Sequence, residues 1–461
     1  MSDLLDKIIE ATERRGEEFN RSLVADELVT HHRSFTEKEE LSNEEDSDNE
    51  EVELTPEQEF YRYANTRLLR GVRAKLGQIN YQLKKFYPVI KVNYISRTLS
   101  NQVKAFDKNF ESYKFLFSNL HNKDHLSLRA SIFVIASIYD ITEANLNKLL
   151  YYFAHCEDEY LNDYIHSLSV SLNPNISSRL LTILPFCSGN VLYAGLEILA
   201  FCGELTVQDW RQLTSNKPGR IKYFGMIQRV KLDDRDAYEY ILKNAPEEFY
   251  EERLFLMLLN GNHDALDMCR ISVKEDIDTK NSHIKFLGMA GEIADVALFK
   301  KHLKNENQQY VKSVIKAISN IACLESIECF RDELRGGSDF SELIYFEVSK
   351  ITGVDFSKEE SPFEAFDDWC EKELFRYRYR RVYKGENWSY SSHILELRDE
   401  RNSGEHRLNL WSELSIRTGH KIGFNPYWSI AKQEKAIDRL NLWLESENSD
   451  CLENPWKFGA N

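Results

Sequence analysis

Three stretches of this sequence repeat one arrangement, and this repetition constrains the fold more than any other feature. Each stretch begins with an apolar residue, reaches a small residue, turns, and ends in leucine. The starting residues Ile284 and Ile315 are 31 positions apart. The spacing predicts two short helices joined by a tight turn. The stretches are 196–213, 284–303 and 315–334, the small residues are Gly203, Gly291 and Ala322, and a weaker copy occupies 221–242.

A pair of short helices cannot bury its apolar face alone, so neighbouring pairs must stack. We therefore predict an all-α fold, a HEAT-like α-solenoid in which the pairs form an α/α superhelix. Small residues at the turns are expected to let paired helices approach closely. Stacked pairs of this kind usually present an extended surface to another protein.

The remainder of the chain also favours helix. Only nine prolines and nineteen glycines interrupt 461 residues, so connections should be short, and the alternation typical of strands is hard to find. Apolar residues spaced by three and four predict helices over 95–116, 127–139, 144–154 and 159–172. A last helix beginning at Asn425-Pro426 is predicted to form a helical C-terminal cap, with Ile430, Ile437, Leu440 and Leu444 buried.

The N-terminal part differs in charge from the rest. Between residues 37 and 59 there are twelve acidic residues and one lysine, which predicts a disordered acidic N-terminal segment over 1–54. Thr55-Pro56 then supplies an N-cap and a first helical residue. Eleven basic residues and one aspartate follow over 62–108. The sequence thus predicts four regions: 1–54, an N-terminal helical region over 55–125, the repeats over 126–350, and the cap region over 351–461.

A run of arginines and tyrosines follows a strongly apolar predicted helix that begins near Pro362. Both residue types bury well at protein interfaces, so the run is a candidate protein-binding site. The alternative is a solvated helix end whose tyrosines pack inward. The candidate residues are Arg376, Tyr377, Arg378, Tyr379, Arg380, Arg381 and Tyr383.

No motif for catalysis is found. The phosphate-binding, dinucleotide-binding, nucleophile-elbow and metalloprotease signatures are absent from the sequence, so we expect no enzyme activity and no cofactor. His31-His32, and His121 with His125, lack further ligands at a recognisable spacing, and no metal site is predicted. The eight cysteines stand singly in apolar contexts and are expected to be reduced packing residues.

The charge balance restricts the partners. The formal net charge of −16 opposes general binding to nucleic acid and to anionic membranes, and it attracts a basic partner. The basic and aromatic stretch 62–108 leaves nucleic-acid binding as a weaker alternative. No apolar run is long enough to span a membrane, and the charged start differs from an export signal, so a cytoplasmic location is expected.

Three segments carry a resemblance to a known family. They are ISRTLSNQVKAFDKNFESYKFL near the start, FEVSKITGVDF after the last repeat, and RLNLWSELSIRTGHKIGFNPYWSIAKQ near the end. With these segments the chain resembles an uncharacterised bacterial HEAT-like repeat family encoded in type VI secretion gene clusters. Ile351, Thr352, Gly353 and Asp355 match the family's ITG-hydrophobic-Asp step. The acidic segment and the arginine and tyrosine run depart from the family pattern.

The resemblance implies a role beside a contractile secretion apparatus. The leading hypothesis is an immunity protein or an adaptor for a secreted effector, and a basic nuclease toxin would be drawn to an acidic inhibitor. One alternative is a structural or regulatory scaffold of the apparatus. Another is a lyase-type enzyme, because some HEAT-like repeat proteins have such activity.

Overall fold

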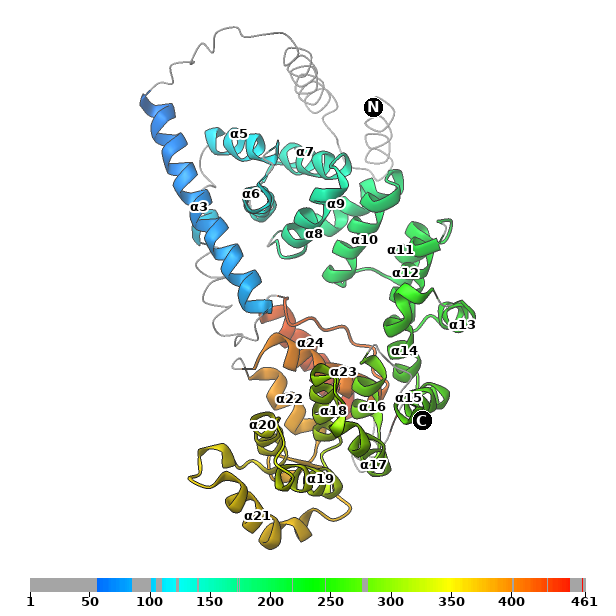
Figure 1. The fold of residues 1–461 in the computed structure, drawn as a ribbon. Helices are drawn as coiled ribbons and strands as arrows, with labels where there is room; N and C mark the ends of the chain where they lie inside the picture. The colour runs from blue at the N-terminus through cyan, green and yellow to red at the C-terminus, as the bar shows by residue number, and fades with distance from the viewer. Residues whose placement is uncertain are drawn as a thin grey trace. The chain divides into compact units, whose positions relative to one another are not determined.

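The computed structural model describes most of the chain from residue 56 onward (Figure 1). The described residues are 56–84, 101–104, 110–121, 124–138, 141–171, 173, 175–217, 219–244, 246–275, 281–399, 402–428, 430–447 and 458. The predicted disordered segment 1–54 lies outside them. The described residues are mainly helical and contain one two-stranded hairpin, which confirms the predicted all-α class. The chain divides into two compact units, Met1–Lys222 and Tyr223–Asn461.

In the first unit, α6 is surrounded by other helices and is buried over most of its length. Leu128 and all residues from Ala130 to the end of the helix are buried, as expected for a helix surrounded by others. Helix α6 packs against α3, α5, α7 and α8, and α8 in turn packs against α10. The elements are α3 Pro56–Lys84, α5 Phe110–Ser118, η1 Asn119–His121, α6 His125–Ser137, α7 Glu143–Ala154, η2 Asp158–Tyr160, α8 Leu161–Ser169, α9 Ile176–Ile183, η3 Leu184–Phe186, α10 Gly189–Cys202 and α11 Val207–Thr214.

The second unit begins within α12 and contains two rows of helices. In the first row α14, α16, α18 and α20 pack successively, and in the second row α15, α17, α19 and α21 do the same. The elements are α12 Gly219–Val230, α13 Arg235–Lys243, η4 Glu247–Phe249, α14 Tyr250–Leu259, α15 His263–Glu275, α16 Ser282–Ala290, η5 Ile293–Asp295, α17 Val296–Lys300, η6 Lys301–Lys304, α18 Gln308–Ile321, α19 Leu324–Arg335, α20 Ser341–Thr352, η7 Phe356–Lys358, α21 Pro362–Glu373, η8 Leu374–Tyr377, β1 Val382–Tyr383, β2 Glu386–Asn387, α22 Tyr390–Arg398, α23 Gly404–Thr418 and α24 Ile430–Glu447. One apolar core extends from α14 to α21 between the rows.

Each repeated stretch forms a helix, a turn and a second helix, as the sequence predicts. Gly203 and Ala322 end their first helices in the left-handed conformation, with φ of 65° and 54°. Gly291 has a negative φ, but a Cβ atom there would lie 2.3 Å from the Leu287 carbonyl oxygen. The small residues therefore end helices, whereas the close approach of α16 and α18 occurs at Gly288, where a Cβ would lie 2.7 Å from the Ala317 Cα.

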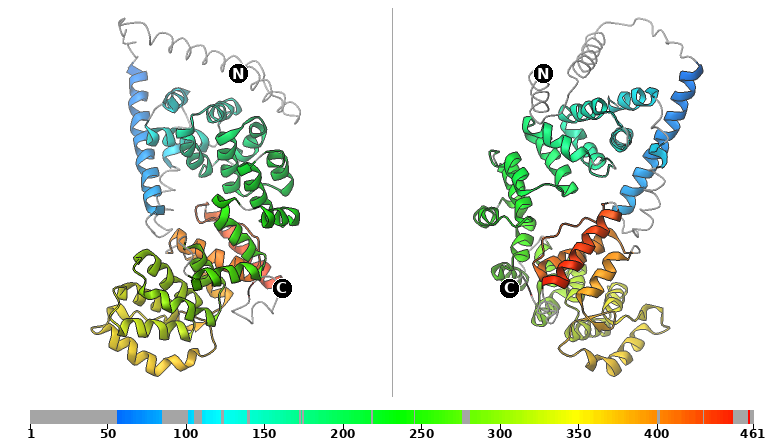
Figure 2. Two further views of the ribbon diagram at one scale, coloured as in Figure 1. Left: turned by 45° about the vertical axis from the view of Figure 1, so that its right-hand side comes forward. Right: turned by 180° about the vertical axis from the view of Figure 1, so that it is seen from behind.

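Helices α22, α23 and α24 form a second, separate core with Trp388. Both views of Figure 2 show them as a group, in orange to red. The buried positions Ile437, Leu440 and Leu444 agree with the predicted stripe, although α24 begins at Ile430, beyond the predicted start. Helix α23 also packs against α14 and α16 of the first row.

Within predicted helix 95–116 the described residues, 101–104 and those from Phe110 in α5, are helical, and the rest lies outside the described residues. The arginine and tyrosine run begins at the helix end of η8 and continues into the hairpin of β1 and β2, which the sequence did not predict. Among the described helices, none is both long and apolar enough to cross a bilayer.

Candidate functional site: an arginine and tyrosine segment with two faces

The candidate run lies between α21 and α22, where the chain changes from helix to hairpin. Strand β1 pairs with β2 through Val382 with Asn387 and Tyr383 with Glu386. The two turn residues, Lys384 and Gly385, have φ of 50° and 81°. Positive φ at both central positions is typical of the type I′ turn, whose twist matches that of a two-residue hairpin. The Lys384-Gly385 pair is therefore the local reason for the hairpin.

Main-chain groups of this hairpin cap the C-terminal ends of two helices. The Val382 amide donates to the Ala322 carbonyl at the end of α18, with an N to O distance of 2.8 Å. The amides of Lys384 and Gly385 donate to the carbonyls of Lys350 and Ile351 at the end of α20, each at 2.8 Å. The last carbonyls of a helix have no partner within it, so these bonds satisfy acceptors that would otherwise need water.

Two glycines make this docking sterically possible. A Cβ atom on Gly353, which ends α20 at φ 75°, would lie 2.7 Å from the Lys384 carbonyl oxygen. A Cβ atom on Gly385 would lie 2.7 Å from the Thr352 carbonyl oxygen. Side chains larger than hydrogen would push the hairpin off the helix end. The hairpin thus docks on the Ile351-Thr352-Gly353 step noted in the sequence, and we call this step the seat of the hairpin.

Beneath the hairpin, Arg381 lies in a buried group of charges. It is 2% exposed, forms an ion pair with Glu413, and donates through Nη2 to the Asn320 carbonyl at 2.7 Å. Arg417 is also fully buried, with Nε 3.2 Å from Glu413 Oε1 and Nη2 3.4 Å from the Gly291 carbonyl oxygen. One carboxylate therefore lies between two arginines, each of which also reaches a main-chain carbonyl of the first row.

The surroundings fix the protonation of this group. Burial by itself raises the pKa of Glu413, but the charges of Arg381 and Arg417 oppose it and hold the pKa well below its usual range. Burial lowers the pKa of Arg417 to about 10, and the Arg381 charge acts in the same direction. Glu413 is thus ionised and Arg417 is charged at neutral pH.

His393 is part of the same group and stays neutral. Its Nε2 accepts a hydrogen bond from the Trp388 indole Nε1 at 3.2 Å and lies 3.5 Å from Glu413 Oε2. Burial lowers the pKa of His393, and Arg381 and Arg417 add to this effect against the opposing influence of Glu413. A neutral ring whose Nε2 accepts from the indole is consistent with this direction.

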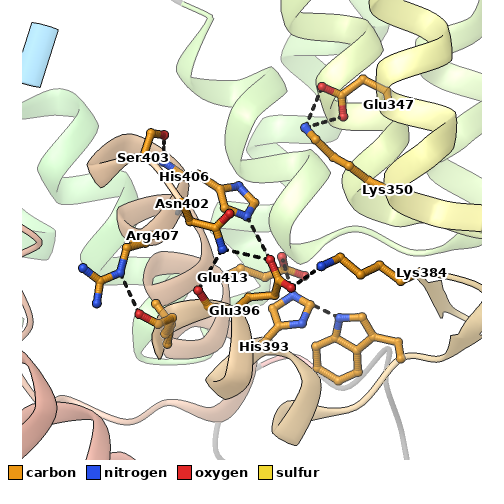
Figure 3. Close-up of polar contacts among 12 residues, drawn as sticks. Glu347, Lys350, Lys384, His393, Glu396, Asn402, Ser403, His406, Arg407 and Glu413 are labelled. Atoms are coloured by element: carbon orange, nitrogen blue, oxygen red, sulfur yellow. Dashed lines mark hydrogen bonds and ion pairs between the residues drawn. The ribbon is translucent and has the colours of Figure 1, made fainter. Parts of the chain in front are cut away.

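A second carboxylate, Glu396, lies beside the outer edge of the hairpin (Figure 3). Lys384 Nζ contacts its Oε1, the Asn402 Nδ2 lies 2.9 Å from Oε2, and His406 Nε2 lies 3.9 Å from Oε2. The contacts with His406, Lys384 and Asn402, of which that with His406 has the largest effect, hold the pKa of Glu396 far below its usual value despite partial burial. A carboxylate stabilised this strongly as an anion is a poor general base, so the arrangement suits a structural role.

The other half of the run faces solvent. Phe375 is 70% exposed and Tyr379 is 77% exposed, and Arg378 and Arg380 are exposed on either side of Tyr379. Tyr379 has φ of 62°, a conformation that non-glycine residues rarely adopt and that costs roughly 1 kcal/mol or more. The Arg378 guanidinium lies over the Tyr379 ring, 5.4 Å from its centroid.

The structure therefore distributes the seven candidate residues over two faces. Arg376, Arg378, Tyr379 and Arg380 are exposed, and Arg376 forms an ion pair of 2.5 Å with Glu373. Arg381 is buried. Tyr377 is half-buried with its ring 5.7 Å from Trp369, and Tyr383 lies with its ring 5.1 Å from His393. Two of the three tyrosines pack inward, and Tyr379 does not.

Sequence reasoning missed the residues that anchor the run. Glu413, Arg417 and His393 lie on α22 and α23, within segments whose apolar positions drew attention first. Their only signal in the sequence is that charged residues occupy the buried faces of helices, which becomes visible only when the faces are known. No sequence pattern marked Glu396 either, because the residues that contact it, Lys384, Asn402 and His406, do not form a motif.

The other histidines and cysteines in the described ranges lie in separate local settings. No group of three or more His, Cys, Asp or Glu side chains there is arranged to hold a metal ion. His125 instead contacts Asp163, with Nδ1 2.6 Å from Oδ2, and Asp163 also accepts from Arg129. The seven described cysteines are free thiols, as predicted. His31-His32 lies outside the described residues.

Comparison with known proteins gives little further guidance. No family model matches the chain, and no curated protein matches it. Among solved structures, the crystal structure of an engineered protein from a structural genomics consortium aligns with 82% of this chain and 100% of its own length. Its sequence identity is 12% and its TM-score is 0.27. A TM-score this low does not indicate a shared fold.

Proposed function

We propose that this protein binds another polypeptide, and that the contact is made by the outward face of segment 375–380. The observation that carries the proposal is Tyr379, an exposed aromatic residue in a strained backbone conformation between two exposed arginines. Strain of this kind persists only where the surroundings enforce it, and it gathers at binding and catalytic sites. An exposed aromatic ring between two guanidinium groups offers contacts typical of a protein interface, so the function that it supports is binding.

The anchoring of the segment favours a binding role. An interface residue contributes most when little conformational freedom is lost on binding. Immediately after the exposed face, Arg381 forms its buried ion pair and the hairpin caps two helices. The exposed side chains therefore project from a fixed base. Tyrosine and arginine are also the residue types that most often dominate the free energy of binding at interfaces.

We infer that the helix pairs are HEAT-like repeats of an α-solenoid, with α22 to α24 as its C-terminal cap. The support is the two-row packing of α14 to α21 around one continuous core and the repeated helix, turn and helix unit. Stacked repeats contact mainly their neighbours, and their ends need a different structure to cover the apolar surface. The three-helix group has its own core, follows the last helix pair in the sequence, and packs through α23 against α14 and α16 of the first row.

We further propose a setting in type VI secretion, as an immunity protein or an adaptor for a secreted effector. This proposal rests on the resemblance of three sequence segments and on the acidic net charge, which favours long-range attraction of a basic effector. The Ile351-Thr352-Gly353 step, one of the resembling features, is also the seat of the hairpin that carries the proposed surface.

The test is isolation of the tagged full-length protein from its native cells after cross-linking, followed by mass spectrometry. We expect one partner protein in amounts comparable to the tagged chain, with cross-links near residues 375–380. Tyr379→Ala should reduce recovery of that partner, whereas Tyr63→Ala, which alters another exposed tyrosine (67%), should not. Equal recovery with both variants would contradict the proposed surface, and absence of any partner would contradict the binding function.

A further inference from the structure

The charges of segment 375–380 are not balanced within the described part of the chain. Arg376 is paired with Glu373, and Arg381 is paired with Glu413. Arg378 and Arg380, by contrast, have no carboxylate within ion-pair distance among the described residues. The chain contains 75 acidic and 59 basic residues, so carboxylates are plentiful. Arg378 and Arg380, which have no such carboxylate among the described residues, lie on either side of the exposed Tyr379. We call these two arginines the basic spot.

This basic spot is small. Burial is the main cause that raises the pKa of Tyr377, which precedes the spot, and the charges of Glu373, Arg376 and Glu386 also act on it. A nucleic acid needs a track of cations that follows several phosphates. Because Arg376 is paired with Glu373, the basic spot offers a ligand the two guanidinium groups of Arg378 and Arg380. Its size therefore matches two carboxylates rather than a phosphate backbone.

The chemistry of the side chains points to the same ligand. Guanidinium groups bind carboxylates through two parallel hydrogen bonds, which gives both strength and geometry. Tyr379 and Phe375 add exposed rings on which apolar parts of a peptide can pack. A short acidic peptide with apolar residues between its carboxylates offers both kinds of contact.

We propose that segment 375–380 binds an acidic stretch of a polypeptide, with Arg378 and Arg380 receiving its carboxylates and Tyr379 receiving a side chain between them. This inference rests on the proposed function and specifies the chemistry of the partner at this surface. It differs from the basic partner that the net charge favours at long range. The net charge of the whole molecule affects the rate at which a partner approaches. The two arginines determine which side chains can bind at this surface.

The probe is a fluorescein-labelled peptide of twelve residues with glutamate and leucine among serines, and fluorescence anisotropy measures its binding to the full-length protein. We expect Arg378→Gln/Arg380→Gln to weaken binding by about five- to tenfold, as two exposed ion pairs allow. The control is Arg235→Gln/Arg439→Gln, which removes the same charge from exposed positions elsewhere in the second unit and should change binding less than about twofold.

Three results would overturn the proposal. They are absence of peptide binding to the wild type at millimolar concentration, equal binding of a peptide with glutamine in place of glutamate, and equal losses in the two double variants. Tighter binding of a twelve-nucleotide oligothymidine would show that the ligand class is nucleic acid and would also overturn it. Capture of the native partner is measured separately, so the proposed function can stand if this inference fails.

Discussion

Arg380 and Arg381 are adjacent in sequence and have opposite environments. Arg380 is exposed, whereas Arg381 is 2% exposed, paired with Glu413 and bonded to the end of α18. The difference arises because the hairpin turns one residue toward the helix ends and leaves the preceding loop in solvent. The comparison teaches that a run of one composition can combine an anchor and a contact surface, and that only the anchor should matter for stability.

The largest effect should come from removing the anchor charge. Arg381→Met leaves Glu413 buried with one arginine in place of two, and we expect the free energy of unfolding to fall by about 3 kcal/mol. Arg380→Met should change it by no more than about 0.5 kcal/mol. Urea unfolding followed by tryptophan fluorescence measures both, because Trp388 and Trp411 lie in the adjacent core. Equal effects would remove the distinction between the two faces.

Acid should lower the free energy of unfolding through buried histidines near the anchor. His420 packs its ring against Trp411 in the core of α22 to α24. Burial lowers the pKa of His420 from 6.5 to about 3, and it lowers the pKa of His393 as well. The unfolded chain therefore binds protons below pH 6.5 that the folded chain does not, so the free energy of unfolding falls as pH falls. From pH 6.5 to 5 the loss from His420 alone should be about 2 kcal/mol.

Urea unfolding at several pH values measures this slope. His420→Gln should flatten it, since the unfolded variant no longer takes up that proton. An unchanged slope in the variant would assign the acid sensitivity to other groups. Below about pH 4.5, Glu413 and Glu396 should add to the loss, because their lowered pKa values make protonation unfavourable in the folded state.

The seat of the hairpin can be tested with two glycines. Gly353 and Gly337 have nearly equal φ, 75° and 76°, but only Gly353 lies against another main-chain segment. Gly337→Ala should cost about 1 kcal/mol for the left-handed conformation. Gly353→Ala should cost about 2 kcal/mol, since the methyl group also displaces the hairpin. Thermal unfolding compares them, and equal costs would contradict the close docking.

The smallest expected effect has the opposite sign. Tyr379→Gly removes a side chain from a residue at positive φ, so the free energy of unfolding should rise by up to about 1 kcal/mol. Peptide binding by the same variant should weaken. A variant that is more stable and binds less well would show that the strain serves the contact face. A fall in stability would indicate that the tyrosine supports the fold.

Much of the fold could be predicted from the sequence, because helical periodicity is a local property. The helix pairs of the repeats, α7 and the apolar helix α21 follow from the spacing of apolar residues. The hairpin could not be predicted in this way. Its two strands contain only four residues in total. The hairpin is held by hydrogen bonds to carbonyls at the ends of α18 and α20, which are distant in the sequence.

The candidate run was identifiable from composition, but its division into two faces was not. Nothing in the order Arg-Tyr-Arg-Tyr-Arg-Arg distinguishes Arg381 from Arg378. The distinction requires Glu413 on α23 and the Asn320 carbonyl on α18 to be in place. Buried ion pairs depend on tertiary contacts, so sequence spacing alone cannot reveal them.

The bonds from the hairpin to α18 and α20 also bear on the order of folding. Arg381 meets the Asn320 carbonyl across 61 positions, so α18 leaves the ribosome well before the group that caps it. Until residues 381–385 arrive, the ends of both helices must be hydrated or fray. A chain arrested before this point should show rapid amide exchange in the last turns of α18 and α20, and the completed chain should protect them.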